Sequence, residues 1–234
     1  MNLRPQNILP TALSALAVFA VAAGPADAAK MAKFTAEGPG GLAKPQARSA
    51  AGCDNTTARA GQVSEDALAN STVCLLNVER TSRGLRALRV NGRLSAAAQQ
   101  HTSDMVRRRY FSHTSRSGSD MSDRIRGNGY LSGARSWMIG ENLAWGSGGQ
   151  STPQMIVDAW MASPPHQHNL LLPGFNEIGI AAVKGTPLWK LDLLGVTVTT
   201  EYGWRNNNTD GKKKRKCSKK QKAKRSKRCR KRRR

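Results

Sequence analysis

Two histidines and one glutamate are the side chains in this chain of 234 residues whose types could do chemistry together. They are His113 in Phe111-Ser112-His113, Glu141 in Gly140-Glu141-Asn142, and His166 at the end of the run from Trp160. The separations, 28 and 25 positions, exceed the reach of one helical turn, so only tertiary folding could join the three. Two imidazoles and a carboxylate would suit Zn²⁺ or another divalent cation, with an open position for water.

The same three side chains could instead form a structural network, in which Glu141 accepts hydrogen bonds from backbone groups or from both imidazoles. Both interpretations stay open, and no catalytic residue is assigned; the candidates are Glu141, His113 and His166. Ser112 and Ser163 lie near these histidines, but proximity in sequence does not establish the hydrogen bond that a nucleophile needs. The chain has neither a G-x-S-x-G elbow nor an H-E-x-x-H helix.

The elements that must position these residues can be placed from apolar periodicity and capping residues. Helices are expected over residues 64–83, 91–109, 120–126 and 152–163, a short turn over 166–171, and strands over 137–145, 177–183 and 188–202. Helices first, strands last and no regular βαβ alternation predict an α+β fold with an antiparallel sheet. His101 lies on the apolar face of the second helix and is expected to be a hydrogen-bonded core or rim histidine, whereas His168 is expected to be exposed.

The amino-terminal segment has the form of a secretory signal over residues 1–28. Arg4 precedes an apolar run over residues 13–23, and Ala26-Asp27-Ala28 has the small-x-small pattern of a cleavage site. An uncleaved membrane anchor is the alternative, although the run is short for a bilayer span of about 20 residues. No other segment could span a membrane. Residues 29–63 are rich in Ala, Gly, Lys and Pro without a period, and they predict a linker that is mostly disordered.

The four cysteines are expected to form disulfides if the chain is exported to an oxidising compartment. Three pairings are possible, and the sequence favours Cys53–Cys74 and Cys217–Cys229 because each pair is local. Metal-binding thiolates are the weaker alternative, since no C-x-x-C spacing occurs.

The net charge of +23 is concentrated at the carboxyl end. Residues 212–234 contain 17 Lys and Arg and no Asp or Glu. Residues 205–234 therefore predict a basic disordered tail, which would attract anionic cell-envelope polymer or anionic lipid. Nucleic acid would be attracted electrostatically as well. The tail has no aromatic residues to stack on bases, so sequence-specific nucleic-acid binding is not expected.

Several stretches, taken in order, resemble one known family. They are Cys74 to Arg80, Ala97 to Met105, Phe111-Ser112-His113, Gly140-Glu141-Asn142, Trp160 to His166 with Asn169-Leu170-Leu171, and Phe175 to Ile180. Residues 68–203 resemble the bacterial CAP-domain proteins of the secreted SCP/pathogenesis-related-1 superfamily.

This resemblance implies an α-β-α sandwich over residues 64–204, with a surface cavity that in the wider family holds two histidines and two acids. His113 and His166 match the histidines and Glu141 matches the first acid. Ser163 stands at the position of the second acid, and Gln167 stands where an arginine is common. The cavity is therefore one carboxylate short of the family's metal-binding set.

The function expected from the sequence is a secreted, extracellular binding module, retained at anionic cell-envelope polymer by its tail and not assigned a catalytic activity. A metal-dependent, peptidase-like hydrolase using His113, Glu141 and His166 is the first alternative, with Zn or another divalent cation as cofactor. A lipid or sterol carrier is the second, because Trp145, Trp160 and Trp189 could line a groove. Large aromatic residues are more often part of a core.

Overall fold

The computed structural model describes residues 20–23, 52–187 and 195–207. The helices are α1 (Glu65–Thr81), α2 (Gly92–Arg108), α3 (Met121–Gly127), the 3₁₀ helix η1 (Gly148–Gln150), α4 (Pro153–Ala162) and α5 (Pro164–Leu171). The strands are β1 (Ala20–Ala23), β2 (Arg89–Val90), β3 (Ser136–Ser147), β4 (Glu177–Lys184) and β5 (Gly195–Asn206). No helix among the described residues is long and apolar enough to cross a membrane.

A mixed sheet in the order β1-β3-β5-β4-β2 forms the middle of the molecule. Its long strands are antiparallel, as predicted, with β5 between β3 and β4. The two-residue strand β2 differs, because it pairs parallel with the start of β4. Strand β1 pairs with β3 at residues 138–141 and lies inside the apolar run predicted to be a signal. That prediction remains untested.

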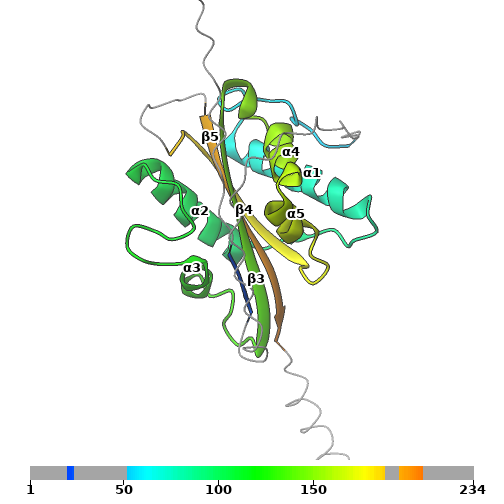
Figure 1. Cartoon of the computed structure of the whole chain (residues 1–234), viewed down its shortest axis with the longest axis vertical. Helices are drawn as coiled ribbons and strands as arrows, with labels where there is room; N and C mark the ends of the chain where they lie inside the picture. Colours follow the sequence, from blue (N-terminus) through cyan, green and yellow to red (C-terminus); the bar gives the residue numbers. More distant parts are fainter. Residues whose placement is uncertain (1–19, 24–51, 188–194, 208–234) are drawn as a thin grey trace, which may run out of the picture.

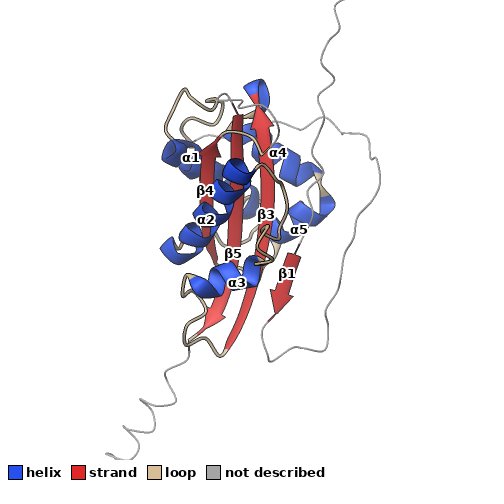
Figure 2. Cartoon of the chain, turned by 90° about the vertical axis from the view of Figure 1, so that its left-hand side faces the viewer, coloured by secondary structure: helices blue, strands red, loops and turns tan. Residues whose placement is uncertain are grey.

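Helices cover both faces of this sheet (Figures 1 and 2). Helices α2 and α3 contact one face, while α1, α4 and α5 cover the other. The larger apolar cluster lies between α1, α4 and the sheet, and a smaller one joins α2, α3 and β3. The predicted α-β-α sandwich is therefore confirmed.

Side-chain caps start four of the helices, at the residues that the sequence pattern predicts. The capping residues are Ser64 for α1, Asn91 for α2, Asp120 for α3 and Thr152 for α4. Each side chain accepts hydrogen bonds from backbone N–H groups of the first turn, which have no partner inside the helix. The cap at Asp120 fixes where α3 begins, and so it sets the end of the loop that carries His113.

Helix α5 corrects the sequence analysis, which expected only a short turn over residues 166–171. Pro164 and Pro165 occupy its first turn, where a missing N–H costs nothing and the fixed φ of proline suits a helix. The same two prolines end α4 at Ala162 and begin α5. His166 therefore projects from a helix.

Two glycines allow the sheet to approach its neighbours closely. A Cβ at Gly179 of β4 would overlap the backbone of Leu94 and Ser95 in α2. A Cβ at Gly203 of β5 would overlap the Tyr130 side chain. Tyr130 is fully buried and its hydroxyl donates to Glu177 Oε2 at 2.7 Å. These contacts set the distance between the sheet and the α2 layer.

Arg80 at the end of α1 is wholly buried and ties separate segments together. Its guanidinium donates to the carbonyl oxygens of Arg86, Leu170, Leu172 and Phe175, over distances from 2.7 to 3.2 Å. Three of these carbonyls belong to the end of α5 and the segment after it. Arg80 therefore holds the carboxyl end of the helix that carries His166.

A disulfide joins Cys53 to Cys74 in α1, which confirms one of the favoured pairings. Closing a loop of this size stabilises a fold by roughly 3 kcal/mol. The segment ahead of Ser64 also packs on the body, because Ala60 is buried and its N–H donates to Ser151 Oγ at 3.2 Å. Cys217, Cys229 and residues 208–234 of the predicted tail lie outside the described residues.

Candidate functional site

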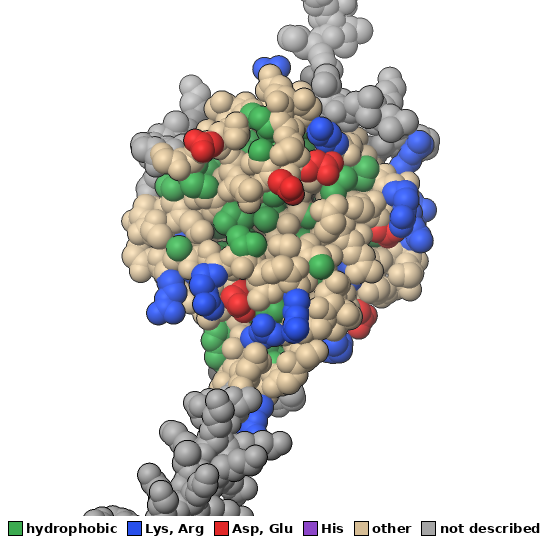
Figure 3. Space-filling model, turned by 180° about the vertical axis from the view of Figure 1, so that it is seen from behind, with side chains coloured by type: hydrophobic (Ala, Val, Ile, Leu, Met, Phe, Trp, Pro, Cys, Tyr) green, Lys and Arg blue, Asp and Glu red, His purple; other side chains and the backbone are tan. Residues whose placement is uncertain are grey.

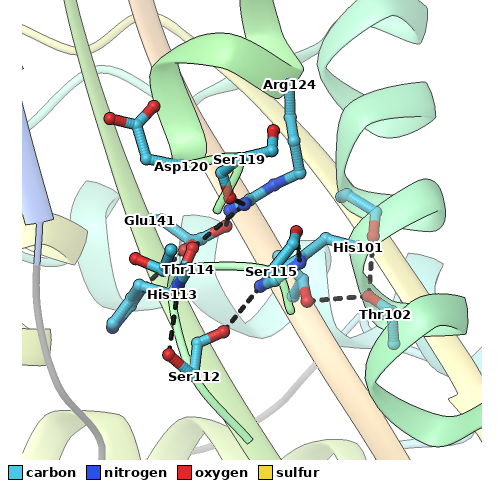
Figure 4. A network of polar contacts seen from close by, with 12 residues as sticks. His101, Thr102, Ser112, His113, Thr114, Ser115, Ser119, Asp120, Arg124 and Glu141 are labelled. Atoms are coloured by element: carbon cyan, nitrogen blue, oxygen red, sulfur yellow. Dashed lines mark hydrogen bonds and ion pairs between the residues drawn. The ribbon is translucent and has the colours of Figure 1, made fainter. Parts of the chain in front are cut away.

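Glu141 is the centre of a buried ionic network between the sheet and α3 (Figure 4). It lies on β3, on the face covered by α2 and α3, and its side chain is 0% exposed. His113 Nδ1 donates to Glu141 Oε1 at 2.5 Å, and Arg124 Nη2 donates to Oε2 at 2.6 Å. Both carboxylate oxygens are therefore engaged by other side chains.

Arg124 on α3 supplies the positive charge of this network. Its Nη1 also donates to the backbone carbonyls of His113 and Ser119, at 3.0 and 3.1 Å. One guanidinium thus fixes two points of the loop between α2 and α3 and the carboxylate of β3. Arg124 carries no family motif, and the sequence analysis missed it.

The charge of Glu141 is stabilised by these contacts. Burial alone would raise its pKa, but the hydrogen bond from His113 and the charge of Arg124 outweigh burial and lower the pKa to about 2. Glu141 is therefore an ionised acceptor, and His113 must carry its proton on Nδ1 to donate to it. In a neutral imidazole, Nε2 then keeps its lone pair, and it has no hydrogen-bond partner among the described residues.

His166 lies on α5, in the layer on the opposite side of the sheet from α2 and α3, and is buried. Its backbone carbonyl accepts from Asn142 Nδ2 at 3.0 Å, and Asn169 Nδ2 donates to the Glu141 carbonyl at 3.2 Å. Burial, followed by the charge of nearby His113, lowers the pKa of His166 to about 3. Its imidazole is therefore neutral at pH 7, as a metal-ligating imidazole must be.

The structure thus brings Glu141 and His113 into direct contact and places His166 near them on a separate layer. His101 is fully buried, and its Nε2 lies 2.8 Å from the Ser112 carbonyl, to which it donates. Burial is the main cause that lowers the pKa of His101 to about 4. It is the hydrogen-bonded core histidine that the sequence predicts, and His168 is exposed as predicted.

Glu201 is a second buried acid that the sequence analysis did not single out. It faces Glu141 directly across the β3–β5 pair and is 0% exposed. Burial, and then the negative charge of Glu141, raise the pKa of Glu201 well above its ordinary value. The raised pKa favours the protonated form of Glu201, and Arg124 balances the negative charge of Glu141. The alternation Thr197, Thr199, Glu201 along one strand is the sequence signal that could have revealed it.

This arrangement differs from a three-ligand metal site. No group of three or more His, Cys, Asp or Glu side chains in the described ranges is arranged to hold a metal ion. A metal ligated by Glu141 would have to share carboxylate oxygens that already accept hydrogen bonds from His113 and Arg124. Glu141 instead has the geometry of a residue that orients an imidazole from behind, which leaves His113 Nε2 as the atom suited to a ligand.

The remaining residues considered from the sequence have other roles. Ser112 Oγ accepts from the Thr114 N–H at 3.1 Å. Trp160 is 1% exposed in the larger core, and its indole N–H donates to the Leu143 carbonyl at 3.0 Å. Trp145 is partly buried, and Trp189 lies outside the described residues. The lipid-carrier alternative remains a prediction. Trp160 cannot line its groove, because this side chain lies in the core.

Comparison with known proteins identifies the family to which this fold and site belong. Residues 73–202 match the model of the CAP family, the cysteine-rich secretory protein family. This match covers more than half of the chain, and the chain belongs to the CAP family. The resemblance inferred from the motifs is confirmed.

One curated relative and several solved structures are similar to the chain. An uncharacterized protein of Bacillus subtilis strain 168, YkwD, is 34% identical over 141 residues, which are 60% of this chain and 52% of that protein. The chain thus spans about half the length of that relative. An extracellular SCP-domain protein of Bacillus anthracis matches at 22% identity with a TM-score of 0.47, over 61% of this chain and 44% of that one. An outer surface protein of Borrelia burgdorferi matches at 22% identity with a TM-score of 0.48, over 57% of this chain and 90% of that one.

Proposed function

We propose that this chain is an extracellular binding module of the CAP family, held at anionic cell-envelope polymer by its basic tail. Three observations support the proposal. The family is one of secretory proteins. The amino-terminal residues have the pattern of an export signal, and residues 212–234 carry 17 cations with no anion. The proposal thus assigns recognition to the folded domain and retention to the tail.

The proposal rests mainly on one observation, which is that Glu141 is fully buried and that both of its carboxylate oxygens accept hydrogen bonds from other side chains. A general base must lie within hydrogen-bond reach of the proton it abstracts. Both oxygens of Glu141 are occupied by His113 and Arg124, and the side chain has no exposed surface. A role in holding the loop to the sheet accounts for all of these contacts. Binding therefore fits the domain better than hydrolysis that uses Glu141 as the base.

Retention by the tail can be tested by measuring association with isolated cell envelopes. A variant without residues 212–234 should lose most of its association at low salt, and the full chain should lose its own as salt rises. A variant in which the tail lysines are changed to arginine keeps the charge and serves as the matched control. Equal association of the full chain and the truncated variant at low and high salt would refute retention by the tail.

A metal-dependent hydrolase remains the second candidate, because His113 Nε2 is directed by Glu141 in the manner of a metal-bound imidazole. His113 and His166 would hold the ion, which would supply Lewis acidity to a bound substrate. Calorimetric titration of the full chain with Zn²⁺ should then show one saturable site, lost in the His113→Ala/His166→Ala double variant. A His168→Ala variant is the control, since that histidine is exposed. Binding that persists in the double variant, or no binding in the unchanged chain, would eliminate this candidate.

A further inference from the structure

A polar hollow of about 230 Å³ opens beside the carboxyl-terminal half of α2, and the functions discussed above do not use it. Its lining residues come from α2, the loop before α3, and α3 itself. They are Gln100, His101, Asp104, Arg107, Arg108, Ser115, Ser117, Ser119 and Arg124. The hollow has room for several waters at about 30 Å³ each, or for one small polyatomic ion.

Arg124 lines this hollow and carries a donor that no other group within the described ranges uses. Its terminal nitrogens bind Glu141, His113 and Ser119, but its Nε–H has no hydrogen-bond partner among the described residues. The side chain is only 2% exposed, so bulk water cannot readily replace a partner. A buried donor without an acceptor is costly and rare in folded proteins. The nitrogen itself has less than 1 Å² of accessible surface, so a ligand of the hollow would reach it through a small rearrangement of the Arg124 side chain.

The rim adds two further cations. The Arg107 and Arg108 side chains are 72% and 50% exposed, and both form ion pairs with the same carboxylate, that of Asp104. One carboxylate cannot neutralise two guanidinium groups, so the rim keeps a net positive charge. Asp104 opposes an anion, but it is already held by both arginines and by the Tyr110 hydroxyl at 2.7 Å. On the face of the molecule drawn in Figure 3, Lys and Arg side chains lie mainly along the lower part and the right-hand side.

The other groups of the hollow are hydrogen-bonding and uncharged. His101 donates its Nε2–H to the Ser112 carbonyl, and its low pKa keeps it neutral. Ser115, Ser117 and Ser119 bring hydroxyl groups from one short loop, in which the Ser115 N–H donates to the Ser119 carbonyl at 2.9 Å. Hydroxyl and guanidinium donors on several sides suit an ion that accepts hydrogen bonds at several oxygens.

We propose that this hollow binds a phosphate-type oxyanion, with Arg124 at its floor, Arg107 and Arg108 at its rim, and the three serines at its side. The guanidinium groups provide charge-assisted hydrogen bonds, and the hydroxyls of Ser117 and Ser119 complete the set of donors. Ser115 Oγ lies 3.5 Å from His101 Nδ1, the nitrogen that accepts when Nε2 carries the proton, so its own proton is shared with His101. The phosphate group belongs either to a free ion or to a phosphodiester polymer, since the chemistry of recognition is shared. This site lies on the folded domain and does not depend on the tail.

NMR titration of the full chain with inorganic phosphate tests this proposal directly, with the Arg124 Nε–H resonance as the readout. This resonance should shift and saturate as phosphate is added at constant ionic strength, whereas chloride should leave it unchanged. Changing Arg107 and Arg108 to glutamine should weaken binding about tenfold or more, because charge-assisted hydrogen bonds are lost. The reporter is local, so phosphate bound by the tail does not contribute.

The matched control changes Arg59 and Arg89 to glutamine, which removes the same charge from two exposed positions outside the hollow. The control should bind phosphate as the unchanged chain does. An Arg124 resonance that does not move, or equal weakening in the two double variants, would overturn the proposal. A second titration with a soluble phosphodiester polymer separates the two sources: tighter binding than phosphate assigns the site to polymer, and equal or weaker binding assigns it to the free ion.

Discussion

Replacing Arg124 with methionine should lower the free energy of unfolding by about 3–5 kcal/mol, because it leaves Glu141 as a buried charge without its ion-pair partner. Domains of this size are stable by only about 5–15 kcal/mol, so the change would remove a large part of the total. The loss should appear in urea unfolding at pH 7. It should be accompanied by loosening of the loop around His113, whose carbonyl Arg124 also binds.

Arg126→Met is the matched control, because Arg126 lies on the same helix with its side chain 58% exposed and forms an ion pair with Asp123 at the surface. Exposed pairs of this kind contribute about 0–1 kcal/mol. The double variant Arg124→Met/Glu141→Gln should recover part of the loss, since it removes both charges together. If Arg124→Met cost no more than Arg126→Met, the ion pair would have no important structural role.

The two buried acids should respond to pH in opposite directions. Glu141 has a folded-state pKa below its ordinary value of 4.5, so its stabilisation is present above that pH and is lost as the pH falls towards about 2. Glu201 has a folded-state pKa above its ordinary value of 4.5, so it holds its proton to a higher pH in the folded state than in the unfolded state. Its presence therefore becomes more destabilising as the pH rises above 4.5. In urea unfolding, Glu201→Gln should therefore change the free energy of unfolding more in favour of the folded state at about pH 8 than at about pH 4. Glu141→Gln should lower the free energy of unfolding at neutral pH. A Glu201→Gln effect that did not change with pH would contradict the assignment of a proton to Glu201.

Arg80→Ala should also lower the free energy of unfolding by about 3–5 kcal/mol, because buried carbonyls at the end of α5 lose their donor. Arg80→Lys should recover only part of the loss, since a single ammonium cannot reproduce the planar fork that spans four carbonyls. Urea unfolding measures both effects. Arg83→Ala is the control on the turn that follows, where the arginine pairs with Glu79 at the surface. Equal costs for Arg80→Ala and Arg83→Ala would contradict the role assigned to Arg80.

Much of the fold follows from local sequence. The caps at Ser64, Asn91, Asp120 and Thr152 and the apolar periodicity between them predict the helices, because these signals act within one turn. Helix α5 was missed because its two prolines were interpreted only as an end of α4. Proline also suits the first turn of a helix, and both roles apply at the same two residues.

Only the site residues that lie in sequence motifs could be predicted. Glu141 and His113 were identified, but their direct hydrogen bond depends on the loop before α3. Arg124 and Glu201 were missed because their importance arises from tertiary contact, across 17 positions in one case and across a strand pair in the other. A periodicity argument shows which face a residue occupies, and it does not show which charge lies opposite.

The close approach at Gly179 ties the evolution of the fold to that of the site. Any side chain there must displace the start of α2, because its Cβ would overlap the backbone of Leu94 and Ser95. His101 and Asp104 lie further along the same helix, so they would move with it. Homologues that diverge at Gly179 would therefore need compensating changes in α2 to keep this histidine and the neighbouring polar hollow in place. Among homologues, a change at Gly179 should therefore be accompanied by changes in α2, and homologues that keep this glycine should also keep the position of the polar groups of α2.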